Sequence, residues 1–308
     1  MKRFKHVAHG LALLCLLSLS ACQSQSLPMT FRQSNAQVQA QAQDWFQQLS
    51  PDLQAYYAPA QGLRGAALFE RLSEIVQQAE SLDYLTATEF LYTVADHVQL
   101  GKESAIHAAY SNILVRGDGP SGHKYKEDGD ANGDGKRGDS INCEHTWPQS
   151  FFDKTGPMRT DMHHLFPTLS TPNSQRGSHA FGMASEGKVV YQLKSGAKLA
   201  SLTGPYSVFE PPNVQKGNTS RALLYFYLRY HKAPIRGGDY QSQYFFVSRL
   251  PMFQSWLQAD PVDANERTRH DLIAKRQGNR NPFVDIPGLL ELIGLETLQA
   301  SERLQSHR

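Results

Sequence analysis

The chain has 308 residues, with 31 lysine and arginine residues against 29 aspartate and glutamate residues, for a formal charge of +2. Three of the basic residues stand in the first five positions, so a chain without residues 1–21 would carry 31 − 3 = 28 basic and 29 acidic residues, a charge of −1. This balance excludes a molecule that attracts polyanions through its overall charge, and any such attraction must come from a local patch.

The N-terminal residues have the pattern of an export signal. A basic head, Met1–Lys5, precedes an apolar stretch over residues 7–19 that is too short for a permanent membrane span. The order Leu-Ser-Ala-Cys ending at Cys22 resembles the bacterial lipoprotein box, in which the cysteine is lipidated and becomes the new N-terminus. We therefore predict a signal peptide over residues 1–21 and a lipid anchor on Cys22, with ordinary secretion as the alternative. By the same resemblance, Gln23 favours the outer membrane.

A Gln-, Ser- and Ala-rich segment, residues 22–44, is predicted to be a tether. Residues 45–295 show no repeat and no internal linker, which favours a single, mainly helical α+β domain, and residues 296–308 are interpreted as a C-terminal tail. Only Cys143 would remain in the folded part, so no intramolecular disulfide is predicted. We predict a helix that begins at residue 51, further helices over residues 63–76, 86–100, 220–230 and 266–273, and a strand over residues 188–193.

An acidic, glycine-rich stretch between residues 117 and 139 approaches the pattern of a calcium loop. Oxygen-bearing side chains alternate, glycine stands at the sixth position, and the twelfth position holds Asp where Glu is usual. The candidate ligands for a structural Ca²⁺ are Asp128, Asp130, Asn132, Asp134 and Asp139. A solvated acidic turn is the alternative.

The densest chemistry lies in residues 142–150 and 161–167. Hydrolysis of a phosphodiester needs a base for water, a cation for the developing charge and a donor that holds the phosphate. His145 suits the base because an unperturbed imidazole, with a pKa of about 6.5, is available in its neutral form. Glu144 suits Mg²⁺, which takes few protein ligands. A zinc site from Cys143 and the histidines matches no standard spacing, and a Cys143–His145 nucleophile pair lacks a group that orients the base.

Three strings together resemble the bacterial endonuclease I family of periplasmic and extracellular nucleases. They are Asn-x-Glu-His-Thr-Trp-Pro-Gln-Ser at 142–150, Asp-Met-His-His-Leu-Phe-Pro at 161–167 and Asn-x-x-Arg at 173–176. Later landmarks at 216–222 and 277–283 follow in the same order, and the resemblance covers residues 45–290. It implies a ββα-metal finger (His-Me finger) core, in which two strands and a helix hold one divalent ion.

The resemblance also implies roles for single residues. His145 would be the general base, with Glu144 and Asn173 as ligands of Mg²⁺, for which Mn²⁺ can substitute. Arg176 follows Asn173 within one helical turn and would contact the phosphate, with pairing to Asp161 as the alternative. The remaining candidates are Asp161 and His163 as groups that orient the site, with a structural role as the alternative, and Arg221 and Arg280 as contacts to nucleic acid. Of His163 and His164, at most one is expected to point inward, and His163 is favoured.

One departure from the family concerns the leaving group. Some members place an arginine between the base and the Asp-x-His string, whereas this chain has only Lys154 and Arg159 in that interval. The residue that stabilises the leaving group is therefore left open.

The predicted protein is an exported, lipid-anchored, metal-dependent endonuclease that acts as a monomer on DNA without sequence preference, and the sequence leaves open whether it also cuts RNA. A phosphodiesterase for small nucleotides would use the same site with a different groove around it. A calcium-binding surface lipoprotein without catalysis would explain the acidic loop and the anchor, but it would leave Glu144, His145 and Arg176 unexplained.

Overall fold

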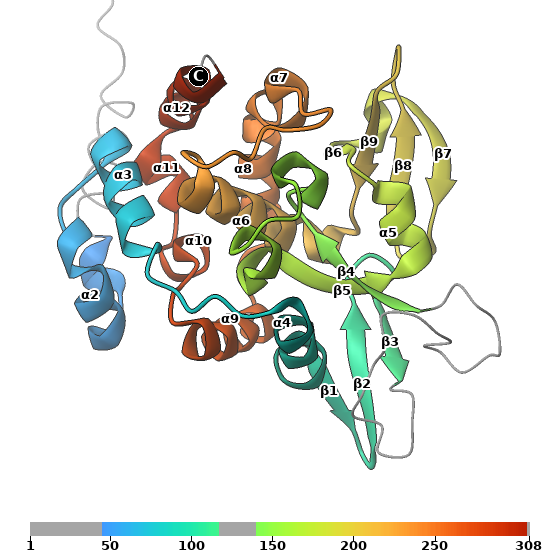
Figure 1. Ribbon diagram of the computed structural model, residues 1–308, viewed down its shortest axis with the longest axis horizontal. Helices are drawn as coiled ribbons and strands as arrows, with labels where there is room; N and C mark the ends of the chain where they lie inside the picture. Colours follow the sequence, from blue (N-terminus) through green and yellow to red (C-terminus); the bar gives the residue numbers. More distant parts are fainter. Residues whose placement is uncertain (1–44, 117–139, 307–308) are drawn as a thin grey trace, which may run out of the picture. The chain divides into compact units, whose positions relative to one another are not determined.

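The computed structural model describes residues 45–116 and 140–306 (Figure 1). The predicted signal peptide, Cys22 and the tether lie outside the described residues, as does the calcium-loop candidate from Asp128 to Asp139. Helices and three small sheets occur together, in agreement with the predicted α+β class.

The strands are short, and most helices are short as well. The strands are β1 (His97–Leu100), β2 (Glu103–Ala108), β3 (Ile113–Arg116), β4 (Ile141–His145), β5 (Leu165–Leu169), β6 (Ala180–Phe181), β7 (Lys188–Gln192), β8 (Lys198–Ser201) and β9 (Ser207–Glu210). The α-helices are α2 (Pro51–Tyr57), α3 (Gly65–Ile75), α4 (Tyr84–Phe90), α5 (Ser170–Arg176), α6 (Asn213–Tyr230), α7 (Ser242–Phe245), α8 (Leu250–Ala259), α9 (Ala264–Gln277), α10 (Pro282–Asp285), α11 (Leu289–Ile293) and α12 (Leu295–Ser306). The short π and 3-10 turns include η4 (Leu91–Ala95), η7 (Met162–His164) and η8 (Ala184–Glu186).

The strands form three sheets, and the sequence strings that contain the candidate site residues lie in the second sheet or next to it. The first is antiparallel with the order β1-β2-β3, and the second is the antiparallel pair β4-β5. The third has the order β6-β9-β8-β7, in which β6 and β9 are parallel and the other pairs antiparallel. The first two sheets meet where the amide of Ala109, just after β2, donates to the carbonyl of Pro167 in β5.

Helix α6 forms the centre of the core, and α3, α8 and α10 pack around it (Figure 1). Nearly all of its side chains are buried, so it lacks the apolar stripe of a surface helix. Its three buried cations each meet a carboxylate: Lys216 pairs with Glu210, Arg221 with Glu266 and Arg229 with Asp161. Since buried charges are tolerated when they are paired and hydrogen-bonded, these pairs let a charged helix lie inside the domain.

Two predicted boundaries need correction. The helical run expected over residues 86–100 ends at η4, because residues from His97 onward pair with β2 as an edge strand. The segment expected to be a tail from residue 296 contains most of α12, with Leu298 fully buried. In the same helix the buried Glu302 accepts from Arg236 and Tyr240, so α12 is a packed part of the domain.

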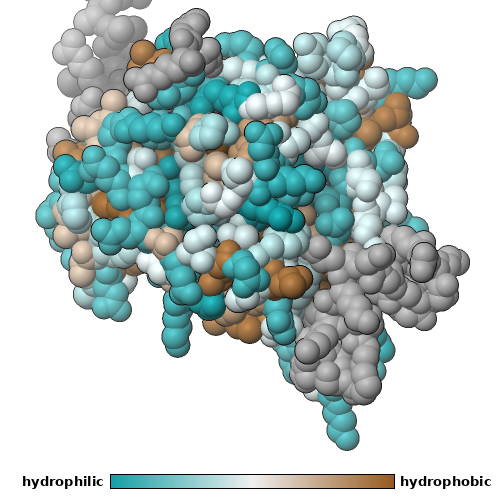
Figure 2. Space-filling model, in the orientation of Figure 1, coloured by the Kyte–Doolittle hydropathy of each residue, from teal (hydrophilic) through white to brown (hydrophobic). Residues whose placement is uncertain are grey.

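The surface of the domain is mostly polar. Figure 2 shows hydrophobic atoms over the outer edge of the third sheet, where Val189 and Val190 of β7 are exposed. Within residues 45–116 and 140–306, no helix has both the length and the apolar character needed to cross a membrane.

Candidate active site

Strand β4 places Glu144 and His145 at its end. In the β4–β5 register, Glu144 lies opposite Phe166 and His145 opposite Leu165. Strand β5 leads directly into α5, so two strands and a helix that carry the three strings are joined in one unit. Ser170, at the start of α5, donates its backbone amide to the carbonyl of Ser140 and thereby ties the helix to the beginning of β4.

Trp147 anchors the end of this strand in the core. Its side chain is fully buried, its ring stacks on Phe226 of α6 with centroids 5.3 Å apart, and its indole N–H donates to the carbonyl of Ile235 at 2.9 Å. Pro148 follows and has no amide hydrogen with which to continue a strand. The Trp-Pro pair, which begins two residues after His145, therefore prevents β4 from continuing and fixes its end on α6.

Glu144 is 2% exposed, and its contacts use one carboxylate oxygen. Oε1 accepts from the Tyr110 hydroxyl at 2.8 Å and lies 3.0 Å from Nη1 of Arg176. Burial raises the pKa of Glu144 to about 7, although Arg176 and Tyr110 both favour the ionised form. A divalent cation at the other oxygen would favour the ionised form of Glu144 further, so this carboxylate could serve as a metal ligand.

His145 is 5% exposed and is held in one orientation. Its Nε2 lies 3.0 Å from the carbonyl oxygen of Arg159; since a carbonyl only accepts, Nε2 carries the proton and Nδ1 the lone pair. Its ring lies nearly parallel to that of Tyr84, with centroids 6.3 Å apart. Burial, followed by the neighbouring His164, lowers the pKa of His145 to about 3, so the imidazole is neutral at physiological pH.

Arg176 points inward, which contradicts its expected contact with the phosphate. The side chain is 1% exposed, and its guanidinium donates to the backbone carbonyls of His145 and Thr146 as well as approaching Glu144. Its other face lies over the Phe181 ring at 4.5 Å. The alternative pairing with Asp161 is not formed either, because Asp161 is paired with Arg229. Arg176 therefore holds the end of β4 and Glu144 in place.

Asn173 lies in the middle of α5 and is half-buried. It stands three residues before Arg176, on the same side of the helix as the arginine that reaches Glu144. Its amide oxygen and the carboxylate of Glu144 are hard oxygen donors, the type that Mg²⁺ prefers. Within the described ranges no group of three or more His, Cys, Asp or Glu side chains could hold a metal, and a Mg²⁺ site does not require one.

Asp161 and His163 belong to a different, buried cluster. Asp161 accepts from Tyr225, Tyr230 and Arg229 of α6 and from Gln277 of α9. His163 lies against Tyr225 and contacts the carbonyl oxygen of Asn279 through Nε2. The histidine next to the base is His164, whose ring centroid is 5.6 Å from that of His145. The adjacent residue of the pair, which the sequence analysis disfavoured, is thus the one beside the site.

Arg221 and Arg280 are both committed to carboxylates, which corrects their assignment as nucleic-acid contacts. Arg221 is 2% exposed and binds both oxygens of Glu266 at 2.6 Å. Arg280 donates to Asp285 and Asp271. A guanidinium that is buried or already neutralised has little to offer a phosphate, so both residues support the fold.

Three residues near the base and ligand were not identified as site residues from the sequence. Tyr110, after β2, reaches Glu144, whereas Tyr84 of α4 and Arg159 lie beside His145. The guanidinium of Arg159 lies 4.3 Å over the Tyr84 ring, and in the part of the chain that the structure describes it has no acidic partner. Only Arg159 had a signal in the sequence, namely its position between the base and the Asp-Met-His-His string.

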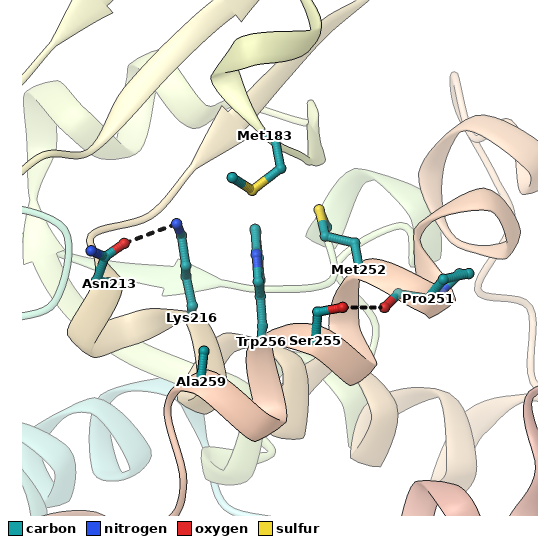
Figure 3. A pocket seen from close by; sticks show the side chains of 8 residues that line it. All are labelled: Met183, Asn213, Lys216, Pro251, Met252, Ser255, Trp256 and Ala259. Atoms are coloured by element: carbon teal, nitrogen blue, oxygen red, sulfur yellow. Dashed lines mark hydrogen bonds between the residues drawn. The ribbon is translucent and has the colours of Figure 1, made fainter.

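A pocket of about 650 Å³ lies apart from these residues, between the start of α6, α8 and the segment before η8. Figure 3 shows Lys216, Trp256 and Met252 rising from the two helices toward Met183. Lys216 is bonded there to Asn213 and Glu210, and none of the lining residues is a candidate from the sequence analysis.

Comparison with known proteins gives a consistent result. The model of the endonuclease I family matches residues 65–288. An extracellular ribonuclease of Bacillus amyloliquefaciens is 28% identical over 256 residues, which cover 77% of each chain, and one of Bacillus subtilis (strain 168) is 28% identical over 251 residues with the same coverage. An extracellular deoxyribonuclease of Aeromonas hydrophila is 27% identical over 150 residues, 49% of this chain and 57% of the relative.

Proposed function

Since the chain belongs to the endonuclease I family, we propose that it is an exported, lipid-anchored endonuclease that requires a divalent metal ion and hydrolyses phosphodiester bonds of DNA and RNA. The observation that carries this proposal is the arrangement of β4, β5 and α5. It joins a carboxylate (Glu144), a neutral imidazole (His145) and an amide (Asn173) in one strand-strand-helix unit, as a ββα-metal finger would.

Glu144 and Asn173 would hold Mg²⁺, or Mn²⁺ in its place. Both contacts to Glu144 use Oε1, which leaves Oε2 as the ligand atom, and the donor set consists of oxygens alone. When bound, the ion supplies positive charge that stabilises the leaving oxygen and the crowded phosphate. Glu144 must be ionised for this role, and Arg176 and Tyr110 both favour its ionised form.

His145 would accept the proton of the attacking water at Nδ1. The contact of Nε2 with the Arg159 carbonyl fixes the ring and the tautomer, so the lone pair has one direction. Burial keeps the imidazole neutral at physiological pH. A base positioned in this way contributes about 10²–10⁴ to the rate of such reactions.

Arg159 takes the place of Arg176 as our proposed phosphate contact. It is next to the base through its own carbonyl, and its guanidinium rests on the face of Tyr84 without an acidic partner among the described side chains. A cation held on an aromatic ring keeps its hydrogen-bond donors available for an anionic oxygen.

The substrate would be recognised through its phosphate, because none of the proposed groups reads a base edge. Relatives of this chain are named as ribonucleases and as deoxyribonucleases, which supports cleavage of both polymers. Relatives named as extracellular or periplasmic support export, and Cys22 would then anchor the exported protein to a membrane surface as a monomer.

The proposal is tested by incubating the purified protein with plasmid DNA, with RNA and with a small-molecule phosphodiester, each in the presence of Mg²⁺, Mn²⁺ or EDTA. We expect both polymers to be cut with either metal and neither to be cut in EDTA. Cleavage of the small ester alone would identify a phosphodiesterase of small substrates. Absence of any cleavage, in a protein that binds calcium through residues 128–139, would leave only the surface-lipoprotein interpretation.

The anchor is tested separately. Cys22→Ser should move the protein from the membrane fraction to the soluble exported fraction while nuclease activity remains. Retention of this variant in the membrane fraction would contradict the anchor without affecting the assignment of the site.

A further inference from the structure

Tyr110 is connected to the proposed metal ligand from a part of the chain that carries no recognisable motif. It lies 34 residues before Glu144, its side chain is 1% exposed, and its hydroxyl donates to Oε1 of Glu144 at 2.8 Å. We propose that Tyr110 is a positioning residue for metal binding: together with Arg176 it occupies one carboxylate oxygen of Glu144 and leaves the other to the metal ion. This inference rests on the proposed function.

The position of Tyr110 is fixed from three directions. The amide of its neighbour Ala109 donates to Pro167 in β5, which fixes the chain next to the β4–β5 pair. The carbonyl of Tyr110 accepts from the hydroxyl of Ser195, in the turn between β7 and β8, at 2.7 Å. Its ring packs on Phe209 of β9 with centroids 4.7 Å apart. Parts of all three sheets therefore hold the backbone and the ring of Tyr110, which fixes the direction of its hydroxyl group.

Tyr110 and Arg176 approach the same oxygen and act on it differently. Arg176 brings a charge, but its guanidinium is also bound to the carbonyls of His145 and Thr146, so it fixes the carboxylate relative to the strand. Tyr110 is neutral and can only donate or accept a hydrogen bond, since burial raises the pKa of its hydroxyl well above the usual value. Against an ionised carboxylate that accepts, it must donate.

Two donors on Oε1 select one rotamer of the carboxylate. Turning the carboxylate plane away from this orientation would move the bound oxygen away from both donors in a buried site, where lost hydrogen bonds are costly. A ligand that is held in this way needs no reordering when the metal arrives. Groups behind the ligands of metal sites commonly contribute about 10–100-fold to metal affinity.

Tyr110→Phe removes one oxygen atom and keeps the ring against Phe209. A matched control is Tyr57→Phe, because Tyr57 is also fully buried and its hydroxyl also donates to a carboxylate, that of Asp285, at 2.8 Å. Both variants lose a comparable buried hydrogen bond, but only Tyr110→Phe changes Glu144. Arg176→Lys is a second test in case Tyr110→Phe folds poorly, since lysine keeps the charge and loses the fork that spans three oxygens.

The experiment measures binding of Mn²⁺ to the purified protein by the loss of the spectrum of the free ion in electron paramagnetic resonance. We expect the dissociation constant to rise about 10–100-fold in Tyr110→Phe and to stay unchanged in Tyr57→Phe, with turnover of Tyr110→Phe recovered at saturating Mn²⁺. Parental affinity in Tyr110→Phe, or an equal loss in Tyr57→Phe, would overturn the inference. If Glu144→Ala bound Mn²⁺ as the parent does, the proposed metal site itself would fail, an outcome that is distinguishable from failure of the role of Tyr110 alone.

Discussion

Asp161→Asn is the substitution whose effect on stability follows most directly from the contacts. The carboxylate is 2% exposed; Oδ2 accepts from Tyr225, Tyr230 and Arg229, and Oδ1 accepts from Gln277 and from the amide of His163. An amide of the same shape would turn one acceptor into a donor that faces other donors, and it would leave the charge of Arg229 without its partner.

The expected loss is about 3–5 kcal/mol of unfolding free energy, the usual cost of breaking a buried ion pair from one side. For a domain of this size it corresponds to a fall in melting temperature of roughly 6–20 °C. Urea denaturation followed by circular dichroism gives the free energy, and Asp239→Asn is a control, because the hydrogen bond that Asp239 accepts from Ser178 is exposed.

The pH dependence gives an independent check of the same reasoning. Burial alone would raise the pKa of Asp161, but the Arg229 charge, with smaller contributions from His163 and His164, holds it well below its usual range. A depressed carboxyl pKa contributes stability that is present above the unfolded pKa and is lost as the pH falls through the folded one. The difference between parent and Asp161→Asn should therefore be constant near neutrality and shrink in acid. A loss below about 0.5 kcal/mol, the scale of ordinary surface changes, would refute this account of the cluster.

Three further predictions concern the site and its surroundings. Arg221→Ala should lower the unfolding free energy by about 3–5 kcal/mol, because Glu266 stays buried and loses its partner. The Michaelis constant for DNA should not change, and a selective rise of that constant would restore Arg221 as a substrate contact. Arg159→Ala should lower turnover by about 10²–10³ while Mn²⁺ binding stays at the parental level, and parental turnover would remove Arg159 from the mechanism. Because burial raises the pKa of Glu144 to about 7, protons should compete with Mn²⁺ below that pH and weaken its binding by about tenfold per pH unit. The same dependence is expected in His145→Ala, and an affinity for Mn²⁺ that does not change with pH in this range would contradict the role of Glu144.

The local geometry around the candidate residues could be predicted because short strings of the sequence encode it. Glu144 and His145 stand next to Trp147 and Pro148, which fix the end of the strand, and the helix with Asn173 follows its strand without a gap. The α+β class could be predicted because the sequence holds both helical and strand periodicities, and the structure contains both helices and strands.

What the sequence could not predict depends on partners far away in the chain. Arg176 and Asn173 share a helix face by their spacing, but spacing does not tell whether a side chain points inward to the carbonyls of β4 or outward to a substrate. Arg221 meets Glu266 across 45 residues, and Tyr110 meets Glu144 across 34. These contacts arise from tertiary packing, which leaves no periodicity in the sequence.

Adjacent residues and element boundaries show the same limit. His163 and His164 are equivalent in the sequence, and only the 3-10 turn η7 decides that His164 faces His145 while His163 faces α6. The helical run expected over residues 86–100 ends with η4, and from His97 onward pairing with β2 prevails over local propensity.

The division of labour between Glu144 and His145 is the central claim, and cleavage of a radiolabelled DNA by His145→Ala in single-turnover conditions with saturating Mg²⁺ tests it most directly. We expect the rate to fall by about 10²–10⁴ while the dissociation constant for Mn²⁺ remains that of the parent, because the base is lost and the ligand is kept. A near-parental rate in this variant would contradict the assignment and transfer the role of base to another group, with His164 the first to examine.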